Sequence, residues 1–180
     1  MQHKGTKRIK TERLLLRKFR MEDAAYMFEN WASDPKVTEF LTWQPHGSPD
    51  VTKAIVTEWV NGYSQPNFYQ WVIELKEISQ PIGSISVVEI DEESQTFEIG
   101  YCIGARWWGK GITAEAFKQV IHYLFEELGV QCITAKHDTE NPNSGKVMQK
   151  CGMQYVGTKE KAGKNNRGIC DLAYYELNRN

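Results

Sequence analysis

The stretch that most constrains the fold of this chain runs from Phe97 to Leu128. Residues 97 to 103 alternate as in a strand, and apolar residues then recur at helical spacing from Ile112 onwards. A glycine-bearing segment, Trp107 to Glu115, joins the two patterns. Glycine lets a backbone lie close to a ligand, and the free N–H groups of a helix's first turn attract anions. The sequence therefore predicts a strand, a turn and a helix that form an anion site suited to phosphate.

The glycine spacing excludes two common phosphate-binding motifs. Gly109 and Gly111 are not followed by a third glycine, because Ala114 stands there, and no acidic residue follows at the ribose distance. This does not fit a dinucleotide fingerprint, and the Gly-Lys-Ser/Thr of a P-loop is also missing. A turn that uses glycine for its geometry alone is an equally good interpretation of the glycines by themselves.

Length and composition favour one compact domain. With 180 residues, 41% of them hydrophobic and 25% charged, a second domain would be small and poorly buried. The net charge of −1 does not favour a protein that coats nucleic acid. Lys4, Lys7, Arg8 and Lys10 make the amino terminus basic. A solvated, partly frayed end is the simplest interpretation of this cluster, with a specific RNA contact as the alternative.

The cysteines and histidines form no metal-ligand or disulfide pattern. The four cysteines lie far apart, at Cys102, Cys132, Cys151 and Cys170. The four histidines are equally scattered, at His3, His46, His122 and His137. We expect small apolar cysteines in a reducing compartment and no bound metal. No apolar run reaches 18 residues and no signal peptide is apparent, so we expect a cytoplasmic protein.

The remaining patterns predict an α/β protein. Strands are expected at residues 14–16, 70–75, 82–90, 95–103, 130–135, 153–158 and 169–177. Helices are expected at about 24–31, 50–63, 112–128 and 141–151. Short loops make residues 70–103 an antiparallel meander, whereas the helical crossover makes 130–135 parallel to the strand before it. Residues 159–168 are expected to form a polar loop.

Three stretches resemble the GNAT superfamily of N-acetyltransferases, most closely its RimJ/RimL-like branch. They are the Trp-Gly-Lys-Gly at 108–111, the run 11–17 with the Glu-Asp-Ala that follows at 22–24, and the run 141–153. The first departs from the general Gln/Arg-x-x-Gly-x-Gly/Ala pattern at Trp108 and Thr113, as is usual in that branch. Neither departure removes a backbone donor.

The resemblance covers about residues 8–178 and implies a single GNAT-type domain over residues 1–180. The implied fold is α/β, with a mixed seven-stranded sheet and helices on both faces. Its two central parallel strands splay apart to hold acyl-CoA.

Acetyl-CoA is the cosubstrate that the resemblance implies. The residues expected at its diphosphate are Trp108, Gly109, Lys110, Gly111, Ile112 and Thr113. Pantetheine would pair with the strand edges at 101–103 and 134–136, where the N–H near Ile103 would stabilise an oxyanion. Asn141 would contact pantetheine, with a role as helix N-cap as the alternative.

Glu98 is the expected general base. Direct attack needs a neutral amine, whereas a primary amine is mostly protonated near neutral pH. Strand alternation turns Glu98 away from Phe97 and Ile99, toward the pocket side. An outward-facing carboxylate in a surface ion pair is an equal alternative, and Glu160 is the competing base.

Ser144 is the expected proton donor to the departing CoA thiolate, or a hydrogen-bond partner of its sulfur. Many GNAT enzymes use a tyrosine seven residues after the motif asparagine, but that position is Met148 here. A first-turn serine that serves the helix terminus is an equal alternative. Cys102 is not expected to carry the acyl group, because nothing near it in sequence lowers the pKa of its thiol.

The predicted reaction is acetyl transfer to a primary amine, by direct attack in a ternary complex. A protein amino terminus, a polyamine and a small-molecule amine all remain open as acceptors. The residues that could determine acceptor specificity are Trp43, His46, Trp59 and Tyr63. Core packing is the simpler interpretation of each of them. A non-catalytic acyl-CoA-binding sensor is the alternative function. We expect neither a membrane nor a nucleic-acid partner, and GNAT proteins often form homodimers.

Overall fold

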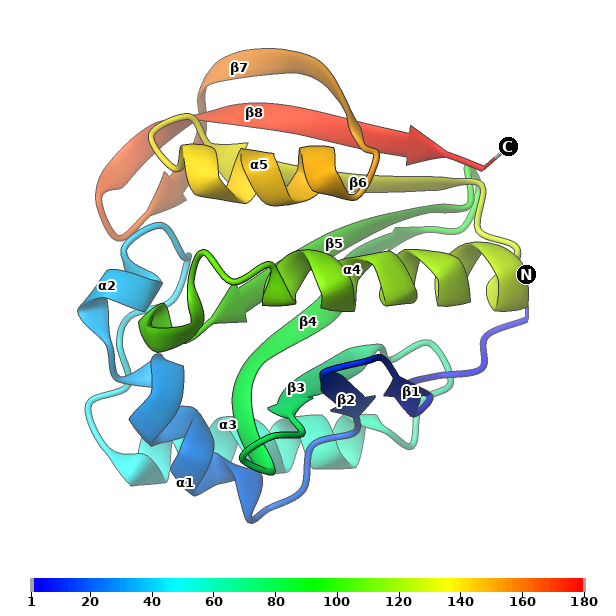
Figure 1. The fold of residues 1–180 in the computed structure, drawn as a ribbon. Helices are drawn as coiled ribbons and strands as arrows, with labels where there is room; N and C mark the ends of the chain where they lie inside the picture. Colours follow the sequence, from blue (N-terminus) through cyan, green and yellow to red (C-terminus); the bar gives the residue numbers. More distant parts are fainter. Residues whose placement is uncertain (1, 180) are drawn as a thin grey trace.

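A mixed sheet of eight strands runs through the molecule in the order β1-β2-β3-β4-β5-β6-β8-β7 (Figure 1). The computed structural model describes residues 2–179. Its strands are β1 (Ile9–Lys10), β2 (Leu14–Arg17), β3 (Gln70–Leu75), β4 (Gln80–Asp91), β5 (Thr96–Ile103), β6 (Cys132–Asp138), β7 (Gln154–Asn165) and β8 (Gly168–Asn178). The mixed α/β fold predicted from the sequence is confirmed, and the two-residue β1 makes the sheet one strand wider than expected.

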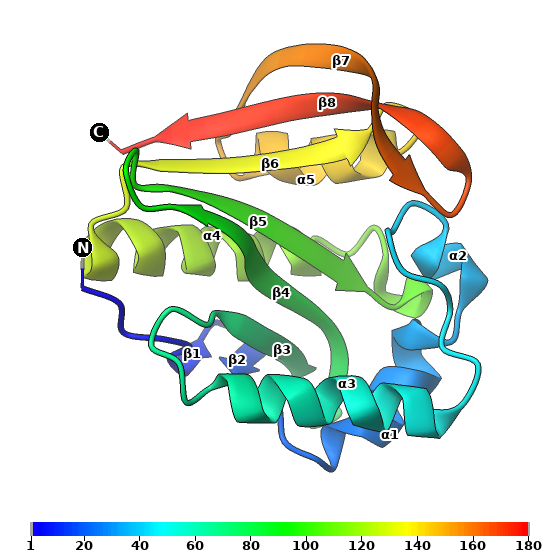
Figure 2. The ribbon, with the colours of Figure 1, turned by 180° about the vertical axis from the view of Figure 1, so that it is seen from behind.

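Helices cover both faces of the sheet (Figures 1 and 2). The helical segments are α1 (Asp23–Met27), η1 (Phe28–Ala32), α2 (Pro35–Thr38), α3 (Pro49–Gly62), η2 (Ala105–Trp107), α4 (Ile112–His122), η3 (Tyr123–Glu127) and α5 (Pro142–Lys150). η1 and η3 are π-helical continuations of α1 and α4. Helices α4 and α5 lie on one face, whereas α1 and α3 lie on the other.

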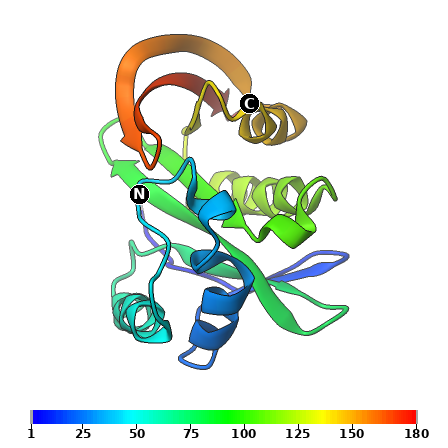
Figure 3. The same cartoon turned by 90° about the vertical axis from the view of Figure 1, so that its left-hand side faces the viewer.

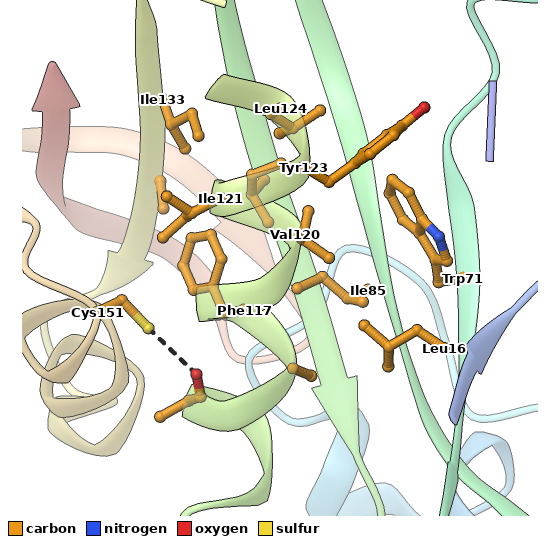
Figure 4. Close-up of a cluster of buried hydrophobic side chains, with 14 of the residues drawn as sticks. Leu16, Trp71, Ile85, Phe117, Val120, Ile121, Tyr123, Leu124, Ile133 and Cys151 are labelled. Carbon is orange, nitrogen blue, oxygen red and sulfur yellow. Dashed lines mark hydrogen bonds between the residues drawn. The ribbon is translucent and has the colours of Figure 1, made fainter. Parts of the chain in front are cut away.

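Each face of the sheet has its own hydrophobic core. Phe117 of α4 and Leu124 of η3 are fully buried together with Ile133 of β6, as the helical spacing predicts (Figure 4). On the opposite face, Trp31 and Val56 are fully buried in a second cluster under η1 and α3. The two cores hold the sheet between two rigid helical layers.

The parallel strands β5 and β6 part toward their carboxyl ends (Figure 2). Their pairing begins at Thr96 with Cys132 and ends at Glu98 with Thr134. Beyond that point β5 pairs only with β4, as far as Ile103, and β6 pairs only with β8. The predicted splay is therefore present, and beyond Glu98 and Thr134 the two facing edges have no strand partner within residues 2–179. We call the region between these two edges the gap.

The prediction of a polar loop at residues 159–168 was wrong. β7 continues to Asn165, and β8 begins at Gly168 after a two-residue turn. Most of β7 is exposed, because it is the outer strand of the sheet. A strand with few buried side chains has no apolar alternation to reveal it, and register shifts near Lys159 and Gly163 interrupt the pattern further.

The basic amino terminus is fastened to the body of the protein rather than frayed. Trp71 Nε1 donates to the carbonyl of Lys7 at 2.7 Å, and Tyr123 Oη donates to the carbonyl of Gly5 at 2.7 Å. Lys7 Nζ also pairs with Glu127 at 2.6 Å. Two of the four basic side chains, Lys4 and Lys7, thus have partners within the protein.

Candidate active site

The glycine turn before α4 leaves its N–H groups free. Gly109 and Gly111 have φ values of +74° and +72°, which only glycine adopts without strain. Gly111 is the N-cap of α4 and offers no side chain to its first turn. Within residues 2–179, no protein acceptor binds the N–H groups of residues 109–111. The turn and the first helical residues, up to Thr113, thus present uncapped donors at the positive end of the helix dipole.

Ile103 directs its backbone polar groups into the gap between the splayed strands. Gly104 N–H donates to the carbonyl of Ile82 at 2.9 Å, so these two residues form a hydrogen-bonded pair of the β4–β5 ladder. Along an antiparallel ladder, such pairs alternate with pairs whose N–H and C=O groups point away from the partner strand. Gly83 and Ile103 form the next pair, which is of this second kind. The N–H of Ile103 therefore points away from β4, toward the edge of β5 that faces β6. This is the N–H that the family resemblance predicted as the oxyanion donor.

Trp108 links the end of β5 to the glycine turn. Its Nε1 donates to the carbonyl of Ile103 at 2.9 Å. Trp108 is nevertheless 48% exposed, so part of its surface remains available beside the turn. The neighbouring Trp107 is buried and anchors η2 in the core.

Glu98 lies where the two strands begin to part. Phe97 and Ile99 are buried in the α4 core, so Glu98 faces the α1/α3 side, as alternation predicted. Its Oε2 accepts from Lys136 Nζ at 2.9 Å, and the side chains are 18% and 37% exposed, respectively. The position of Glu98 beside the parting strands is compatible with a general base. Its ion pair with Lys136 fits the alternative stated above, a carboxylate in an ion pair. Glu160 lies on outer strand β7, with β8 and β6 between it and β5.

Ser144 faces the gap from the opposite side of the sheet. Its Oγ lies 3.0 Å from Tyr101 Oη, and Tyr101 Oη also lies within hydrogen-bond distance of the Ser144 carbonyl, at 3.0 Å. Burial raises the pKa of Tyr101, and so the phenol is protonated near neutral pH. Asn141 occupies the N-cap position of α5, but its side chain makes no capping hydrogen bond. That amide is therefore not used at the helix terminus.

A surface cavity of about 520 Å³ adjoins the glycine turn. Thr11 from the β1–β2 turn, Gly111 before α4, Lys118 in the middle of α4 and Lys150 from the end of α5 line it, together with the carboxylates of Glu12 and Glu115. Its lining is therefore of mixed charge, with two lysines, Glu12 and a Glu115 that is paired with Arg13. An anionic group bound there would face the two lysines beside the uncapped donors at Gly111.

Of the aromatic residues considered for specificity, two serve packing. Trp59 packs on Phe19 with ring centroids 4.8 Å apart. Tyr63 Oη donates to the carbonyl of Gln70 at 2.7 Å and accepts from the N–H of Phe19 at 2.8 Å.

Trp43 and His46 pair with each other in the segment between α2 and α3. Their ring centroids lie 5.2 Å apart, and His46 Nδ1 lies 2.7 Å from Thr52 Oγ1. Burial lowers the pKa of His46, so its imidazole is neutral near neutral pH.

The Acetyltransferase (GNAT) domain family matches residues 13–154 of the chain. The chain belongs to this family. The N-acetyltransferase p20 of Bacillus licheniformis is 34% identical to it over 171 residues, which cover 93% of each protein. These findings confirm the family and the enzyme class predicted from the sequence, that of an acetyltransferase.

Solved structures agree with the GNAT fold. The GNAT-family acetyltransferase from Bacillus anthracis matches with a TM-score of 0.83 at 27% identity, over 96% of this chain and 98% of that one. RimL, a ribosomal L7/L12 α-N-protein acetyltransferase solved in complex with coenzyme A, matches with a TM-score of 0.86 at 16% identity. That match covers 96% of this chain and 98% of RimL, and at this identity it concerns the fold.

The sequence did not reveal two residues that join the site of this GNAT protein. Tyr101 belongs to the same alternating series as Phe97, but its hydroxyl partner on α5 is distant in sequence. Arg13 lies in one of the matched stretches, yet only the fold shows that its guanidinium reaches the carbonyl of Lys110. Both contacts join segments that no local pattern connects.

A membrane span, a metal site and a nucleophilic thiol each require particular features of the described residues. No helix within residues 2–179 is long and apolar enough to cross a membrane. Within the same residues, no three His, Cys, Asp or Glu side chains are grouped to hold a metal ion. Burial raises the pKa of the Cys102 thiol, which disfavours the thiolate that a covalent acyl carrier needs.

Proposed function

We propose that this GNAT protein, acting as a single domain over residues 1–180, transfers the acetyl group of acetyl-CoA to a primary amine. The supporting observation is that β5 and β6 part after Glu98 and Thr134, next to the uncapped start of α4. The strand edges can pair with the amides of pantetheine, and the turn can bind a diphosphate. Ile103 and Trp108 join the two places, so that one extended thioester can occupy both.

In this proposal the donor lies along the α4/α5 side of the gap. Its diphosphate accepts from the N–H groups of residues 109–113, and its pantetheine lies between the free edges, near Asn141. The nucleotide end enters the 520 Å³ cavity, where Lys118 and Lys150 face its phosphate. The thioester carbonyl then points at the N–H of Ile103, which stabilises the developing oxyanion.

The acid and the base of the reaction lie on opposite faces of the sheet. The amine enters from the α1/α3 side and attacks the carbonyl carbon, while Glu98 accepts its proton directly or through one water. The carbon–sulfur bond breaks, and the thiolate receives a proton from the hydroxyl pair of Ser144 and Tyr101. Because donor and acceptor arrive from different sides, both can be bound at once, which is what direct attack requires.

A non-catalytic acyl-CoA-binding module is the second candidate. The observation that favours it is the Glu98–Lys136 ion pair, which engages the proposed base. Catalysis requires that this carboxylate accept a proton despite its ammonium partner, whereas a sensor has no such requirement.

Calorimetry with CoA and acetyl-CoA, followed by transfer assays on an amine panel, tests the proposal. The panel contains peptides with free amino termini, polyamines and small aryl amines. Glu98→Gln is expected to lower kcat/KM by about 100-fold or more with little change in the Kd of CoA. Glu89→Gln is the matched control, because Glu89 is exposed directly opposite Glu98 on β4. Binding without transfer to any amine would favour the sensor, and no binding at millimolar CoA would refute both functions.

A further inference from the structure

Arg13 connects the start of β2 to the glycine turn. Its Nη1 donates to the carbonyl of Lys110 at 2.9 Å, and its Nε donates to Glu115 Oε2 at 2.6 Å. The backbone N–H of Arg13 donates to Glu115 Oε1 at 3.0 Å, and Thr11 Oγ1 donates to the same oxygen at 2.5 Å. The carboxylate of Glu115 thus holds both the guanidinium and the backbone N–H of Arg13, and the guanidinium in turn holds one carbonyl of the turn.

The bond to the Lys110 carbonyl fixes the direction of the next N–H. In a planar trans peptide, the C=O of one residue and the N–H of the following residue point in opposite directions. Because Arg13 binds the carbonyl of Lys110, the N–H of Gly111 points away from Arg13, toward the outer side of the turn. A flipped peptide would put a carbonyl oxygen there, and that oxygen would repel a phosphate.

The turn by itself does not secure this orientation. Gly111 follows the Lys110–Gly111 peptide directly and Gly109 precedes Lys110, and glycine occupies positive and negative φ with nearly equal ease. Nothing within 4 Å would meet a Cβ at Gly109, so packing does not restrain the turn there either. A restraint from outside the turn is therefore needed to favour one peptide orientation.

Glu115 also needs its partners for an electrostatic reason. It lies in the first turn of α4, where a free carboxylate would repel an anion bound at the helix terminus. Burial alone would raise its pKa, but the hydrogen bonds from Thr11 and Arg13 outweigh burial and hold the pKa below its usual value. Glu115 therefore stays ionised near neutral pH, paired with Arg13.

We propose that Arg13 is a positioning residue, which sets the Lys110–Gly111 peptide in the orientation that binds the diphosphate of the acyl donor. Glu115 and Thr11 hold its guanidinium in place for this task. The inference rests on the proposed function, because it concerns the donor site of the same reaction. It makes a specific claim: Arg13 matters only for donors that carry a diphosphate.

The test compares acetyl-CoA with S-acetyl-pantetheine, which lacks the diphosphate. Arg13→Gln is expected to lower kcat/KM for acetyl-CoA by about 10- to 100-fold, the effect of losing one or two charge-assisted hydrogen bonds. For S-acetyl-pantetheine the expected change is less than about twofold, because the restrained peptide does not contact that donor. Glu115→Gln should show the same selectivity with a smaller loss. Arg20→Gln, at an exposed arginine between β2 and α1, is the control and should change neither value.

Arg13→Lys separates positioning from simple attraction of charge. Lysine keeps the positive charge but lacks the planar fork that binds a carbonyl and a carboxylate together. Positioning predicts that Arg13→Lys resembles Arg13→Gln, whereas recovery of wild-type values would overturn the inference. An equal loss with both donors would also overturn it, because a general structural defect does not distinguish them. If wild-type protein binds no CoA, the proposed function itself fails, and if it acetylates while Arg13→Gln is unchanged, only the role of Arg13 fails.

Discussion

Tyr101 reaches from β5 to the first turn of α5, where its hydroxyl lies 3.0 Å from Ser144 Oγ. The sequence singled out Ser144 and excluded the usual tyrosine, because that helix position is Met148, which is buried. A tyrosine is nevertheless present, supplied by a strand instead of a helix. In the proposed reaction, a phenol and an alcohol thus lie together where the thiolate leaves.

The hydroxyl pair can be tested as a unit. Tyr101→Phe and Ser144→Ala are each expected to lower kcat by about tenfold or more, since each removes one member of the route that delivers the proton. The double variant should cost little more than either single one, because residues that act together are not additive. Pre-steady-state transfer assays would measure these losses, with Tyr155→Phe at an exposed tyrosine as the control. Fully additive losses would contradict a shared role.

Helix α5 approaches β6 so closely that one of its positions requires glycine. A Cβ at Gly145 would lie 2.6 Å from His137 Nε2 and 3.2 Å from Tyr175 Oη. His137 cannot turn away easily, because its Nδ1 is held 2.7 Å from the carbonyl of Asp138. The close approach sets the distance between α5 and the sheet. It therefore also sets the positions of Ser144 and Asn141, which lie near Gly145 in the chain.

Gly145→Ala should push α5 away from the sheet. We expect a loss of about 1–3 kcal/mol in the free energy of unfolding, the usual cost of an extra methyl in a packed site. Binding of CoA should weaken as well, since Asn141 and Ser144 move with the helix. Urea unfolding and calorimetry would measure the two effects. Gly47→Ala is the control, because nothing lies within 4 Å of a Cβ there, and equal effects from both variants would refute the packing argument.

Elements of this fold were predictable from the sequence where their pattern comes from neighbouring residues. The glycine turn and α4 follow from residues that are neighbours in the chain, and so does the parallel crossover to β6. By contrast, the second half of β7, residues 159–165, was missed because an outer strand has no buried face to impose a period on its side chains. Arg13 and Tyr101 were missed because their partners, Lys110 and Ser144, lie far along the chain. Such contacts are set by sheet order and helix packing, which single-residue patterns do not encode.

At the scale of the whole molecule, the β7–β8 turn closes on the segment between α2 and α3 (Figure 3). Asn166 Nδ2 donates to the carbonyls of Thr38 and Trp43, both at 2.8 Å. Arg167 pairs with Glu140 at 2.7 Å, just beyond the end of β6. Three segments from different parts of the chain thus meet beside the carboxyl ends of the splayed strands.

In the proposed reaction this junction lies on the acceptor side, because Trp43 packs against the core under η1 and α3, whereas the donor is proposed to lie along α4 and α5. Asn166→Ala removes the side-chain bonds that hold the α2–α3 segment against the hairpin, including the bond that the amide oxygen of Asn166 accepts from Gln44 Nε2 at 2.5 Å. We expect KM for the amine to rise by about 3- to 10-fold, as the loss of one or two such bonds implies. The Kd of CoA should stay within about twofold, because the donor site lies at the start of α4. Steady-state kinetics at saturating acetyl-CoA would measure the first value, and calorimetry would measure the second.

Asn178→Ala, at an exposed asparagine near the other end of β8, controls for the loss of an amide from this strand. A rise in the Kd of CoA with no change in KM for the amine would contradict the assignment of this junction to the acceptor side.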